Sequence, residues 1–320
     1  MAEGSSSRVL RTNSSTRPAN PVPSPFSRRS QPPDSVSTNF HGVAQMLKFI
    51  ALALTALVSF SPSWVTAQAQ PKVKEKVVVG LAHEPPYTNF QAGGTLSGAA
   101  PDLLFRIMKD FGVKELDPKV LEFGAMIPSL QAGRVDVIST GLYINPMRCK
   151  AVLFSEPDLC TAEGFIVPKG NPKALNSFSD VAANDNIRYG VCGGCSAEKR
   201  ATELGVPRSR ITIAPDHQSG IKMLLDGRID VYAAPDLALR SAAEAMGVTD
   251  RFEVRPVAGE PAKCSGIAFR NDQRELRDLV DRKLEALKQS GEYDKIVSKY
   301  GFDPKLARMA KRADLCGGAN

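Results

Sequence analysis

The sequence predicts an α/β fold with two lobes of related construction. Short β-branched segments alternate with amphipathic helical segments from Lys76 onward, which is typical of parallel sheets covered by helices. The same turn from a helix into a strand occurs twice, as Gly133-Arg134-Val135-Asp136 and as Gly227-Arg228-Ile229-Asp230. A less specific explanation of this repeat stays open, because glycine ends helices in unrelated units as well.

The first lobe begins with a strand over residues 77–81, and a helix over residues 101–111 follows it. The helix is indicated by apolar residues that share one helical face, namely Leu103, Leu104, Ile107, Met108 and Phe111. A strand over 120–123, a short helix over 127–132 and a strand over 135–139 form the next unit. We expect the helix over 101–111 to pack on the first strand.

Two clusters of structure-breaking residues mark the passages between the lobes. The first, at residues 167–172, follows a strand over 164–167, and the second lies near residues 256–261. Between them, a helix over 221–225 and a strand over 229–233 belong to the second lobe.

The segment after the second cluster is expected to return to the first lobe. It is predicted to hold a strand over 265–269 and closing helices over 276–287 and 293–300. We therefore expect an inserted second lobe, with lobe 1 formed by residues 70–168 and 262–320 and lobe 2 by residues 169–261.

The N-terminal region differs from the rest in composition. Residues 1–45 are rich in Ser, Pro and Arg, so we expect an unstructured leader or a start codon assigned too early. From Met46, a charged start, an apolar stretch over 49–60 and Ala67-Gln68-Ala69 are the parts of a signal peptide over 46–69, cleaved after Ala69. A membrane anchor is the alternative, but the apolar stretch is shorter than the roughly 20 residues that cross a bilayer. The mature chain is therefore expected in the periplasm.

Net charge and composition exclude several classes of protein. The chain is 42% hydrophobic and 23% charged, which is ordinary for a globular protein with a core. Its formal net charge is +7, but residues 1–69 carry six Lys and Arg against two Asp and Glu, so the mature chain keeps about +3. Charges of both signs are mixed along it, so we expect no nucleic-acid partner.

Six cysteines follow the predicted signal peptide. An even number in an oxidising compartment indicates disulfide bonds. Six cysteines allow fifteen pairings, among which the sequence alone does not choose. We expect three pairs, Cys149 with Cys160, Cys264 with Cys316, and Cys192 with Cys195.

The motif Cys192-Gly-Gly-Cys195 has two alternative interpretations. Its spacing also occurs in thioredoxin-like redox pairs and in one half of a metal site. A metal site is disfavoured because the sequence has no second such motif and His217 is the only other obvious ligand. We therefore expect neither a metal nor another cofactor.

Several short motifs follow one another along residues 74–302: Glu84-Pro85-Pro86-Tyr87, residues 98–102, the two Gly-Arg-x-Asp turns, Phe154-Ser155-Glu156-Pro157 and Gly291-Glu292-Tyr293. With these motifs the segment resembles the type II periplasmic binding proteins of polar amino acid ABC importers. The resemblance implies two Rossmann-like lobes joined by a two-strand hinge. It also implies a non-enzymatic, monomeric protein that binds a small solute between its lobes and delivers it to permease subunits in the inner membrane.

Longer stretches, over residues 122–128, 141–149, 154–160 and 216–230, are similar to one branch of this family, the ectoine- and hydroxyectoine-binding proteins. Ectoine joins a carboxylate to a ring that carries a delocalised amidinium charge. The resemblance therefore implies a small zwitterionic solute. A selective pocket for it needs a clamp for the carboxylate, an acid and aromatic faces.

Arg148 and Glu84 are the candidates for the two charged ends of the solute. A guanidinium matches a carboxylate with two parallel hydrogen bonds, and Arg148 stands where the resemblance puts the ligand arginine. The alternative for Arg148 is a surface pair with Glu156 or Asp158. Glu84 follows the first strand, at the sheet edge where α/β proteins present ligand groups, and by resemblance it is the ligand acid. The alternative for Glu84 is a solvated loop carboxylate.

Tyr87, Phe123 and Tyr143 are expected to wall the pocket. Each follows or ends a strand of the first lobe, and the resemblance places all three in an aromatic box. Cation–π attraction contributes about 0.5–2 kcal/mol per face, so three faces would distinguish a cation from a neutral ring. The alternative for each of them, and most of all for Phe123, is a place in the core.

Lobe 2 is expected to contribute Gly194 and Ser196. Residues 194–197 begin a helix that runs to Leu204, and free N–H groups at a helix N-terminus bind anions, so this end would cover the solute's carboxylate. Ser196 is equally suited to cap the helix. The two cysteines that bracket the glycine pair depart from the family pattern.

The absence of an acidic residue at position 235 also indicates which kind of solute is bound. Amino acid binders of this family usually have an Asp for the α-ammonium group at the position where Pro235 aligns, and Asp236 would need a shift of one residue to replace it. The solute is therefore expected to lack a primary amine.

Other functions stay open. A polar amino acid is the alternative solute. Cyclohexadienyl dehydratases share the fold and use a pocket carboxylate as a general acid, a role open to Glu84 or Glu163, but no His, Ser or metal constellation supports hydrolysis. His83 and His217 are expected to be local hydrogen-bonding groups. A sensor domain is disfavoured because no membrane-spanning or kinase-like segment follows the closing helices.

Overall fold

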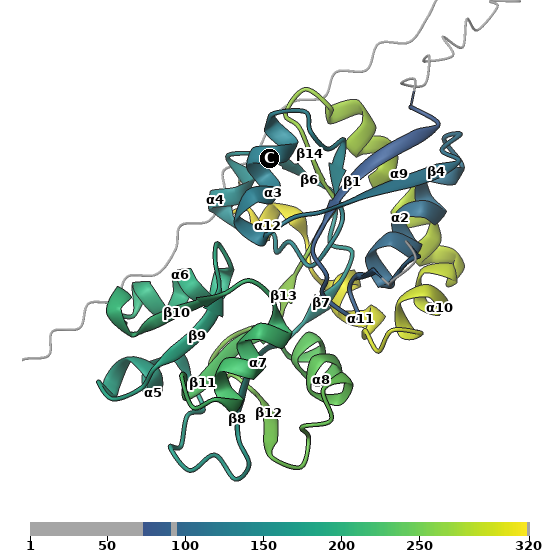
Figure 1. The fold of residues 1–320 in the computed structure, drawn as a ribbon. Coiled ribbons are helices and arrows are strands. Elements are labelled where there is room, and N and C mark those ends of the chain that lie inside the picture. The colour runs from purple at the N-terminus through teal and green to yellow at the C-terminus, as the bar shows by residue number, and fades with distance from the viewer. Residues whose placement is uncertain (1–72, 91–94, 319–320) are drawn as a thin grey trace, which may run out of the picture. The chain divides into compact units, whose positions relative to one another are not determined.

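The computed structural model describes residues 73–90 and 95–318. The expected leader, residues 1–45, and the expected signal peptide, residues 46–69, lie outside the described residues. The described chain folds into two α/β lobes, each built on a five-stranded sheet, as predicted (Figure 1). Within these described ranges no helix is both long enough and apolar enough to span a membrane.

The sheet of lobe 1 has the strand order β4-β1-β5-β14-β6. Its strands are β1 (Lys76–Leu81), β4 (Glu115–Val120), β5 (Val137–Ile138), β6 (Leu153–Phe154) and β14 (Ala268–Phe269). Strand β1 runs parallel to β4 and β5, whereas β14 runs antiparallel to β5 and β6. Because β14 follows the whole second lobe in sequence, the chain returns to the first sheet before its closing helices.

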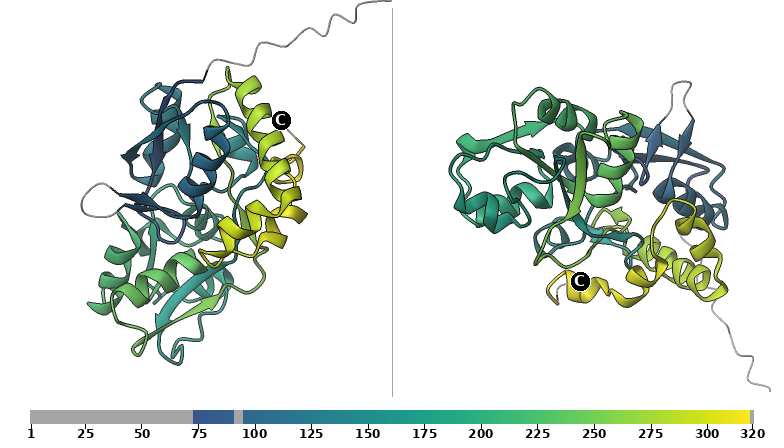
Figure 2. Two further views of the ribbon diagram at one scale, coloured as in Figure 1. Left: turned by 90° about the vertical axis from the view of Figure 1, so that its right-hand side faces the viewer. Right: turned by 90° about the horizontal axis from the view of Figure 1, so that it is seen from below.

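Helices cover both faces of this sheet, over two separate buried clusters. The helices of lobe 1 are α2 (Ala99–Lys109), α3 (Met126–Gln131), α4 (Pro146–Cys149), α9 (Arg274–Ser290), α10 (Glu292–Ser298), α11 (Pro304–Met309) and α12 (Arg312–Leu315). Leu103 and Ile107 of α2 belong to the same buried cluster as Val77 and Val79 of β1, so the predicted packing of this helix on the first strand is confirmed. Figure 2 shows the C-terminal helices, in yellow, along one flank of the molecule.

The second strand of lobe 1 differs from the prediction. A strand is expected over residues 120–123, but β4 ends at Val120 and Phe123 begins the short 3-10 helix η1 (Phe123–Ala125). Strand β4 lies at the edge of the sheet, where Pro118 is tolerated because an edge strand leaves some N–H groups unpaired. Its half-exposed sequence, in which three of six residues are charged, lacks the β-branched run by which a buried strand is recognised.

The sheet of lobe 2 has the strand order β10-β9-β11-β8-β12. Its strands are β8 (Glu163–Pro168), β9 (Tyr189–Cys192), β10 (Ile211–Ala214), β11 (Val231–Pro235) and β12 (Phe252–Pro256). Its helices are α5 (Phe178–Ala183), α6 (Ser196–Glu203), η2 (Arg208–Arg210), α7 (His217–Leu225) and α8 (Asp236–Ala245). Strands β9, β10 and β11 are parallel, so their carboxyl ends lie at one edge, from which α6, α7 and α8 begin.

Two short strands join the lobes. They are β7 (Cys160–Thr161) and β13 (Lys263–Cys264), which pair antiparallel and lie between the lobes in Figure 1. Cys160 stands opposite Cys264 in this pairing, and a disulfide joins them with a Cα–Cα distance of 4.1 Å. The two-strand hinge is therefore present as predicted, and a covalent crosslink spans it. A separate hairpin of β2 (Asn89–Phe90) and β3 (Leu96–Ser97) projects from lobe 1.

Two of the three expected disulfide pairings are wrong. Cys149 pairs with Cys316, and Cys160 pairs with Cys264. The reason is topological, because Cys149 ends α4 in the body of lobe 1 whereas Cys160 already belongs to the hinge. The C-terminal helix α12 brings Cys316 to within 5.7 Å of Cys149, measured between their Cα atoms. The third pair, Cys192 with Cys195, is confirmed.

Candidate functional site

A narrow cavity of about 20 Å³ lies between the two lobes. Its lining comes from both lobes and from the start of β8, and includes Glu84, Phe123, Gly141, Tyr143, Arg148, Glu163, Cys192, Cys195, Ser196 and Pro235. Five of the seven predicted ligand residues therefore line one cavity. The other two, Tyr87 and Gly194, adjoin it. A space of this size holds about one water molecule, so the lobes are in a closed arrangement.

Glu84 has one engaged and one free carboxylate oxygen. It follows β1 in a tight turn closed by backbone hydrogen bonds with Thr88, and only 3% of its surface is exposed. Its Oε1 lies 3.0 Å from Nε2 of His217. Its Oε2 is buried and has no hydrogen-bond partner within the described residues. A buried, unpaired carboxylate oxygen is costly, so this atom is suited to accept a hydrogen bond from a solute.

Tyr87 and Tyr143 lie beside this carboxylate. Both rings are buried, and neither phenol hydroxyl makes a well-formed hydrogen bond within the described part of the chain. Burial raises the pKa of both phenols well above their usual value, so both stay neutral. The ring of Tyr87 packs edge-to-face on Phe302 at 4.7 Å, which makes it the rear support of the site, whereas Tyr143 lines the cavity itself.

Arg148 is a buried cation without a carboxylate partner. It lies in α4, whose N-cap Asn145 accepts a hydrogen bond from the N–H of Arg148, and 9% of its surface is exposed. Its Nη1 donates to the carbonyl of Tyr143 at 2.8 Å and its Nη2 to the carbonyl of Gly194 at 3.0 Å. Its guanidinium carbon lies 5.7 Å from the centre of the Phe123 ring. Burial lowers the pKa of Arg148 to about 10, so the group remains charged at neutral pH.

The alternative of a surface pair for Arg148 does not fit the structure. Glu156 lies 3.4 Å from Arg312, and Asp158 accepts from the hydroxyl of Ser265. Within the residues that the structure describes, Arg148 has no carboxylate at ion-pair distance. Two of its five N–H groups are engaged by carbonyls, which leaves donors for an anionic solute group.

The Cys192–Cys195 disulfide closes the loop that touches Arg148. Gly194 in this loop has a φ of 76°, which is the left-handed region that favours glycine. Its carbonyl accepts from Arg148, but its N–H donates to Oε2 of Glu198 at 2.7 Å. The expectation that the N–H of Gly194 binds the solute is therefore corrected, because an acidic side chain of the same helix already occupies it.

Ser196 is the first residue of α6 rather than its cap. Cys195 is the N-cap, with an extended backbone, and no side chain caps the helix. The capping alternative for Ser196 is therefore wrong, since the helix begins one residue earlier than that role requires. Ser196 nevertheless lines the cavity.

The second acid in the lining, Glu163, is already paired. Oε2 of Glu163 lies 2.9 Å from Nζ of Lys263, which belongs to the other hinge segment. Only 2% of the surface of Glu163 is exposed. Burial raises the pKa of Glu163, and the ammonium of Lys263 opposes this shift. Because Glu163 and Lys263 offset each other, Glu84 and Arg148 are the two charged side chains of the lining that form no ion pair with a Lys, Arg, Asp or Glu of the described residues.

Pro235 lines the cavity where an ammonium-binding acid is expected in amino acid binders. The next residue, Asp236, accepts hydrogen bonds at Oδ1 from the hydroxyl of Thr161 and from the N–H of Leu237. This carboxylate therefore serves the hinge and the start of α8. It does not line the cavity.

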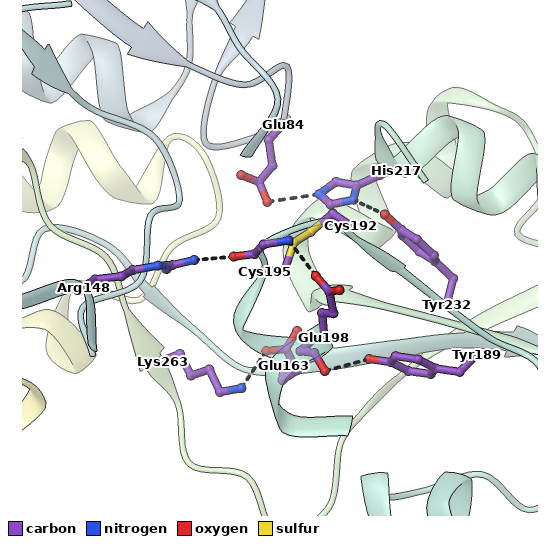
Figure 3. Close-up of a disulfide and its surroundings, with 12 residues drawn as sticks. Glu84, Arg148, Glu163, Tyr189, Cys192, Cys195, Glu198, His217, Tyr232 and Lys263 are labelled. Atoms are coloured by element: carbon purple, nitrogen blue, oxygen red, sulfur yellow. Dashed lines mark hydrogen bonds and ion pairs between the residues drawn. A yellow bond between two sulfur atoms is a disulfide. The ribbon is translucent and has the colours of Figure 1, made fainter. Parts of the chain in front are cut away.

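His217 is the residue that sequence reasoning missed. It is expected to make local contacts, but its Nε2 lies 3.0 Å from Oε1 of Glu84 in the other lobe, and its Nδ1 lies 3.1 Å from the hydroxyl of Tyr232 (Figure 3). A sequence signal was present, because His217 begins the helix after β10, at the edge of a parallel sheet where ligand groups gather. No cluster suited to a metal ion occurs among residues 73–90 and 95–318.

Two α/β lobes, a two-strand hinge and an interlobe cavity with opposite charges define a type II periplasmic binding protein. Residues 77–303 match the family of bacterial extracellular solute-binding proteins, family 3. The chain belongs to this family, whose members serve ABC importers of the amino acid type.

Three similar proteins illustrate the range of the family. A probable amino-acid ABC transporter periplasmic-binding protein, y4tE of Sinorhizobium fredii, is 28% identical over 265 residues, which are 80% of this chain and 87% of the relative. The crystal structure of EhuB in complex with hydroxyectoine is 46% identical, with a TM-score of 0.73 over 76% of this chain and 94% of that one. The ancestral amino acid-binding protein AncCDT-1, a precursor of cyclohexadienyl dehydratase, is 25% identical, with a TM-score of 0.62 over 71% and 95% of the two chains.

Proposed function

We propose that this protein binds ectoine or hydroxyectoine between its lobes and delivers it to the permease of an ABC importer. The observation that carries the proposal is the pair of charges in the cavity, Glu84 with a free buried oxygen and Arg148 without a carboxylate partner in the described chain. A zwitterion satisfies both at once. The 46% identity with EhuB, which was crystallised with hydroxyectoine, supports the same solute.

The carboxylate of the solute is assigned to Arg148. The guanidinium keeps its charge in the buried site, and the carbonyls of Tyr143 and Gly194 orient it. A charged hydrogen bond of this kind is about twice as strong as a neutral one, and the loss of water from the closed site strengthens it further.

The amidinium ring of the solute is assigned to Glu84 and the aromatic side chains. Phe123 and Tyr143 line the cavity and Tyr87 supports it from behind. Each face near a delocalised cation adds about 0.5–2 kcal/mol, so these rings favour a charged ring over a neutral one.

The residue after β11 supports a solute without a primary amine. Pro235 has no polar side chain, and Asp236 is engaged by Thr161 and Leu237. Glu163 stands opposite Pro235 across β8 and β11, but its carboxylate is already paired with Lys263. An α-ammonium group at this end of the cavity would therefore find no uncommitted carboxylate, which is strongly disfavoured for a buried ammonium.

Binding is proposed to couple to closure at the hinge strands β7 and β13. The present cavity of about 20 Å³ is smaller than either solute, so the lobes must separate before a solute enters. The solute docks on lobe 1, and lobe 2 then rotates over it because only the closed form makes both sets of contacts.

Calorimetry on the mature protein tests this proposal. We expect ectoine or hydroxyectoine to bind with a micromolar dissociation constant, about 8 kcal/mol, and to outcompete glycine betaine and a panel of amino acids. Tight binding of a primary amino acid without binding of ectoine would replace the proposed solute by the alternative one.

An enzyme on the same fold is the second candidate, because the buried Glu163 lines the cavity and AncCDT-1 is a precursor of a dehydratase. The pairing of Glu163 with Lys263 disfavours a proton-donating role for this acid. Incubation with prephenate and arogenate is expected to give no turnover, and measurable turnover would favour the enzyme.

A further inference from the structure

His217 of lobe 2 contacts the acid of lobe 1 that the solute is proposed to use. Glu84 belongs to lobe 1 and His217 to lobe 2, and Nε2 of His217 lies 3.0 Å from Oε1 of Glu84. Because a carboxylate only accepts hydrogen bonds, Nε2 must carry the hydrogen and donate it. The hydroxyl of Tyr232, 3.1 Å from Nδ1, then faces the other ring nitrogen.

Lobe 2 fixes the position of this imidazole independently of Glu84. His217 is 8% exposed and Tyr232 is fully buried, and their rings meet edge-to-face at 5.9 Å. The Tyr232 ring packs so closely on α7 that a Cβ at Gly220 would lie 2.4 Å from it. The donor therefore arrives at Glu84 already oriented when the lobes close.

The contact with His217 engages one of the two carboxylate oxygens of Glu84. Oε1 is taken by His217, while Oε2 is buried without a partner in the described residues. Oε2 points toward Gly141, where a Cβ would lie 2.9 Å from it and 3.3 Å from the Tyr87 ring. A hydrogen-bond donor can therefore approach Oε2 from one direction only.

We propose that His217 is a positioning residue that sets the specificity of the site by occupying one oxygen of Glu84. With one oxygen left, the site fits a cation that presents one N–H to the acid, as a ring amidinium does. A primary ammonium or a guanidinium presents several N–H groups and leaves some of them unpaired, which is costly in a closed site. This inference rests on the proposed function, because it takes Glu84 as the acid that meets the solute's cation.

The test compares His217→Leu, which removes the donor, with His217→Gln, which restores an N–H donor. We measure dissociation constants for ectoine, arginine, lysine and glycine betaine by calorimetry. In His217→Leu the preference for ectoine over arginine and lysine is expected to fall about tenfold, the effect of one well-formed hydrogen bond. His217→Gln should recover most of it. Glycine betaine has no N–H group, so its affinity reports the effect on closure alone.

Two controls separate specificity from damage to the fold. Gln218→Leu changes the exposed neighbour of His217 on α7. It should leave the ratios of the dissociation constants of the four solutes as in the wild type. Tyr232→Phe keeps the buried ring but removes the hydroxyl next to Nδ1. Its preference for ectoine over arginine and lysine is expected to lie between those of the wild type and His217→Leu. Unchanged ratios in a folded His217→Leu variant would overturn the proposal.

The inference can fail separately from the proposed function. If the wild type does not bind ectoine, the proposed function fails, and the change in preference between arginine and glycine betaine still tests His217. A ligand-independent measurement is ¹⁵N NMR of the imidazole of His217. It should find Nε2 protonated in the wild type and a changed imidazole spectrum in Glu84→Gln. A ring spectrum that is identical in the two proteins would count against the contact itself.

Discussion

Arg148 of lobe 1 donates a hydrogen bond from Nη2 to the carbonyl oxygen of Gly194 in lobe 2, over 3.0 Å. Glu84, which lines the same cavity, meets His217 of lobe 2. The two charged side chains that are assigned to the solute are therefore also contacts between the lobes. Such contacts form only when the lobes are together, so binding and closure depend on the same side chains.

Replacing Arg148 by lysine should weaken solute binding by about tenfold or more. The planar guanidinium can hold the carbonyls of Tyr143 and Gly194 and a carboxylate at the same time, whereas an ammonium offers one point charge. Calorimetry with ectoine measures the effect. Arg251→Lys is the matched control, because Arg251 also lies 5.7 Å from an aromatic ring, that of Phe252, but lines no part of the cavity. Near-native affinity in Arg148→Lys would remove this residue from the site.

Gly194→Ala should weaken binding by obstructing closure. Gly194 has a φ of 76°, where an L-residue costs about 1–2 kcal/mol. An added Cβ would also lie 2.9 Å from the Cα of Gly124 in the opposite lobe, and backbone there cannot move aside without separating the lobes. We expect a dissociation constant at least tenfold higher and a larger radius of gyration in small-angle scattering with saturating solute.

Gly193→Ala is the control for this prediction. A Cβ at Gly193 would meet only the side chain of Ile213, at 3.2 Å, and that side chain is 38% exposed and free to turn. The variant should bind nearly as the wild type does. Equal losses in both variants would mean that the loop as a whole, rather than the approach of Gly194 to lobe 1, determines affinity.

The sequence predicts the elements of the fold that depend on local periodicity. The helix expected over residues 101–111 is α2 at Ala99–Lys109, because its apolar spacing directly reflects burial on β1. The edge strand β4 is displaced from its predicted place because a half-exposed strand needs no apolar run. Local pattern therefore identifies buried elements well and edge elements poorly.

The parts that sequence reasoning missed depend on contacts between distant segments. The pairing of Cys160 with Cys264 follows from the register of β7 and β13, over a sequence separation of 104. The contact of Glu84 with His217 spans 133 residues and exists only because the lobes meet. Neither of these two contacts produces a periodic pattern in the sequence. The motif-based candidates Glu84, Phe123, Tyr143 and Arg148 do line one cavity, because each follows or ends an element at the same side of lobe 1.

The hinge disulfide should contribute mainly to stability, and the loop disulfide mainly to solute binding. Cys160–Cys264 closes a long loop, for which chain entropy predicts about 4.7 kcal/mol of stabilisation, against about 2 kcal/mol for a loop as short as that of Cys192–Cys195. Replacing both hinge cysteines by alanine should therefore lower the melting temperature more than replacing both loop cysteines does. Replacing both loop cysteines should chiefly weaken solute binding, because this disulfide lines the cavity and holds Gly194 against Arg148.

Calorimetric melting and solute titration of the two double variants check this difference. Peptide mapping under non-reducing conditions first establishes the pairs Cys149–Cys316, Cys160–Cys264 and Cys192–Cys195 in the wild type. A loop variant with unchanged affinity would speak against a role of its disulfide in the site.

Asp158 should make the stability of the protein depend on pH. It is 1% exposed, its Oδ1 accepts from Ser265 and from the N–H of Leu159, and its Oδ2 has no hydrogen-bond partner in the described chain. Burial raises the pKa of Asp158 to about 6, against roughly 4 in an unfolded chain. The folded state therefore binds the proton more tightly, and the stabilisation is complete below about pH 4 and is lost as the pH rises through 6.

Asp158→Asn isolates this effect because the amide stays neutral at every pH. Its Oδ1 can keep both hydrogen bonds of the wild type. Relative to the variant, the wild type should lose up to about 3 kcal/mol of unfolding free energy between pH 4 and pH 8, since two units of pKa shift correspond to about that amount. Urea unfolding of both proteins at these two pH values measures the difference. If the difference in unfolding free energy is the same at both pH values, folding does not raise the pKa of Asp158.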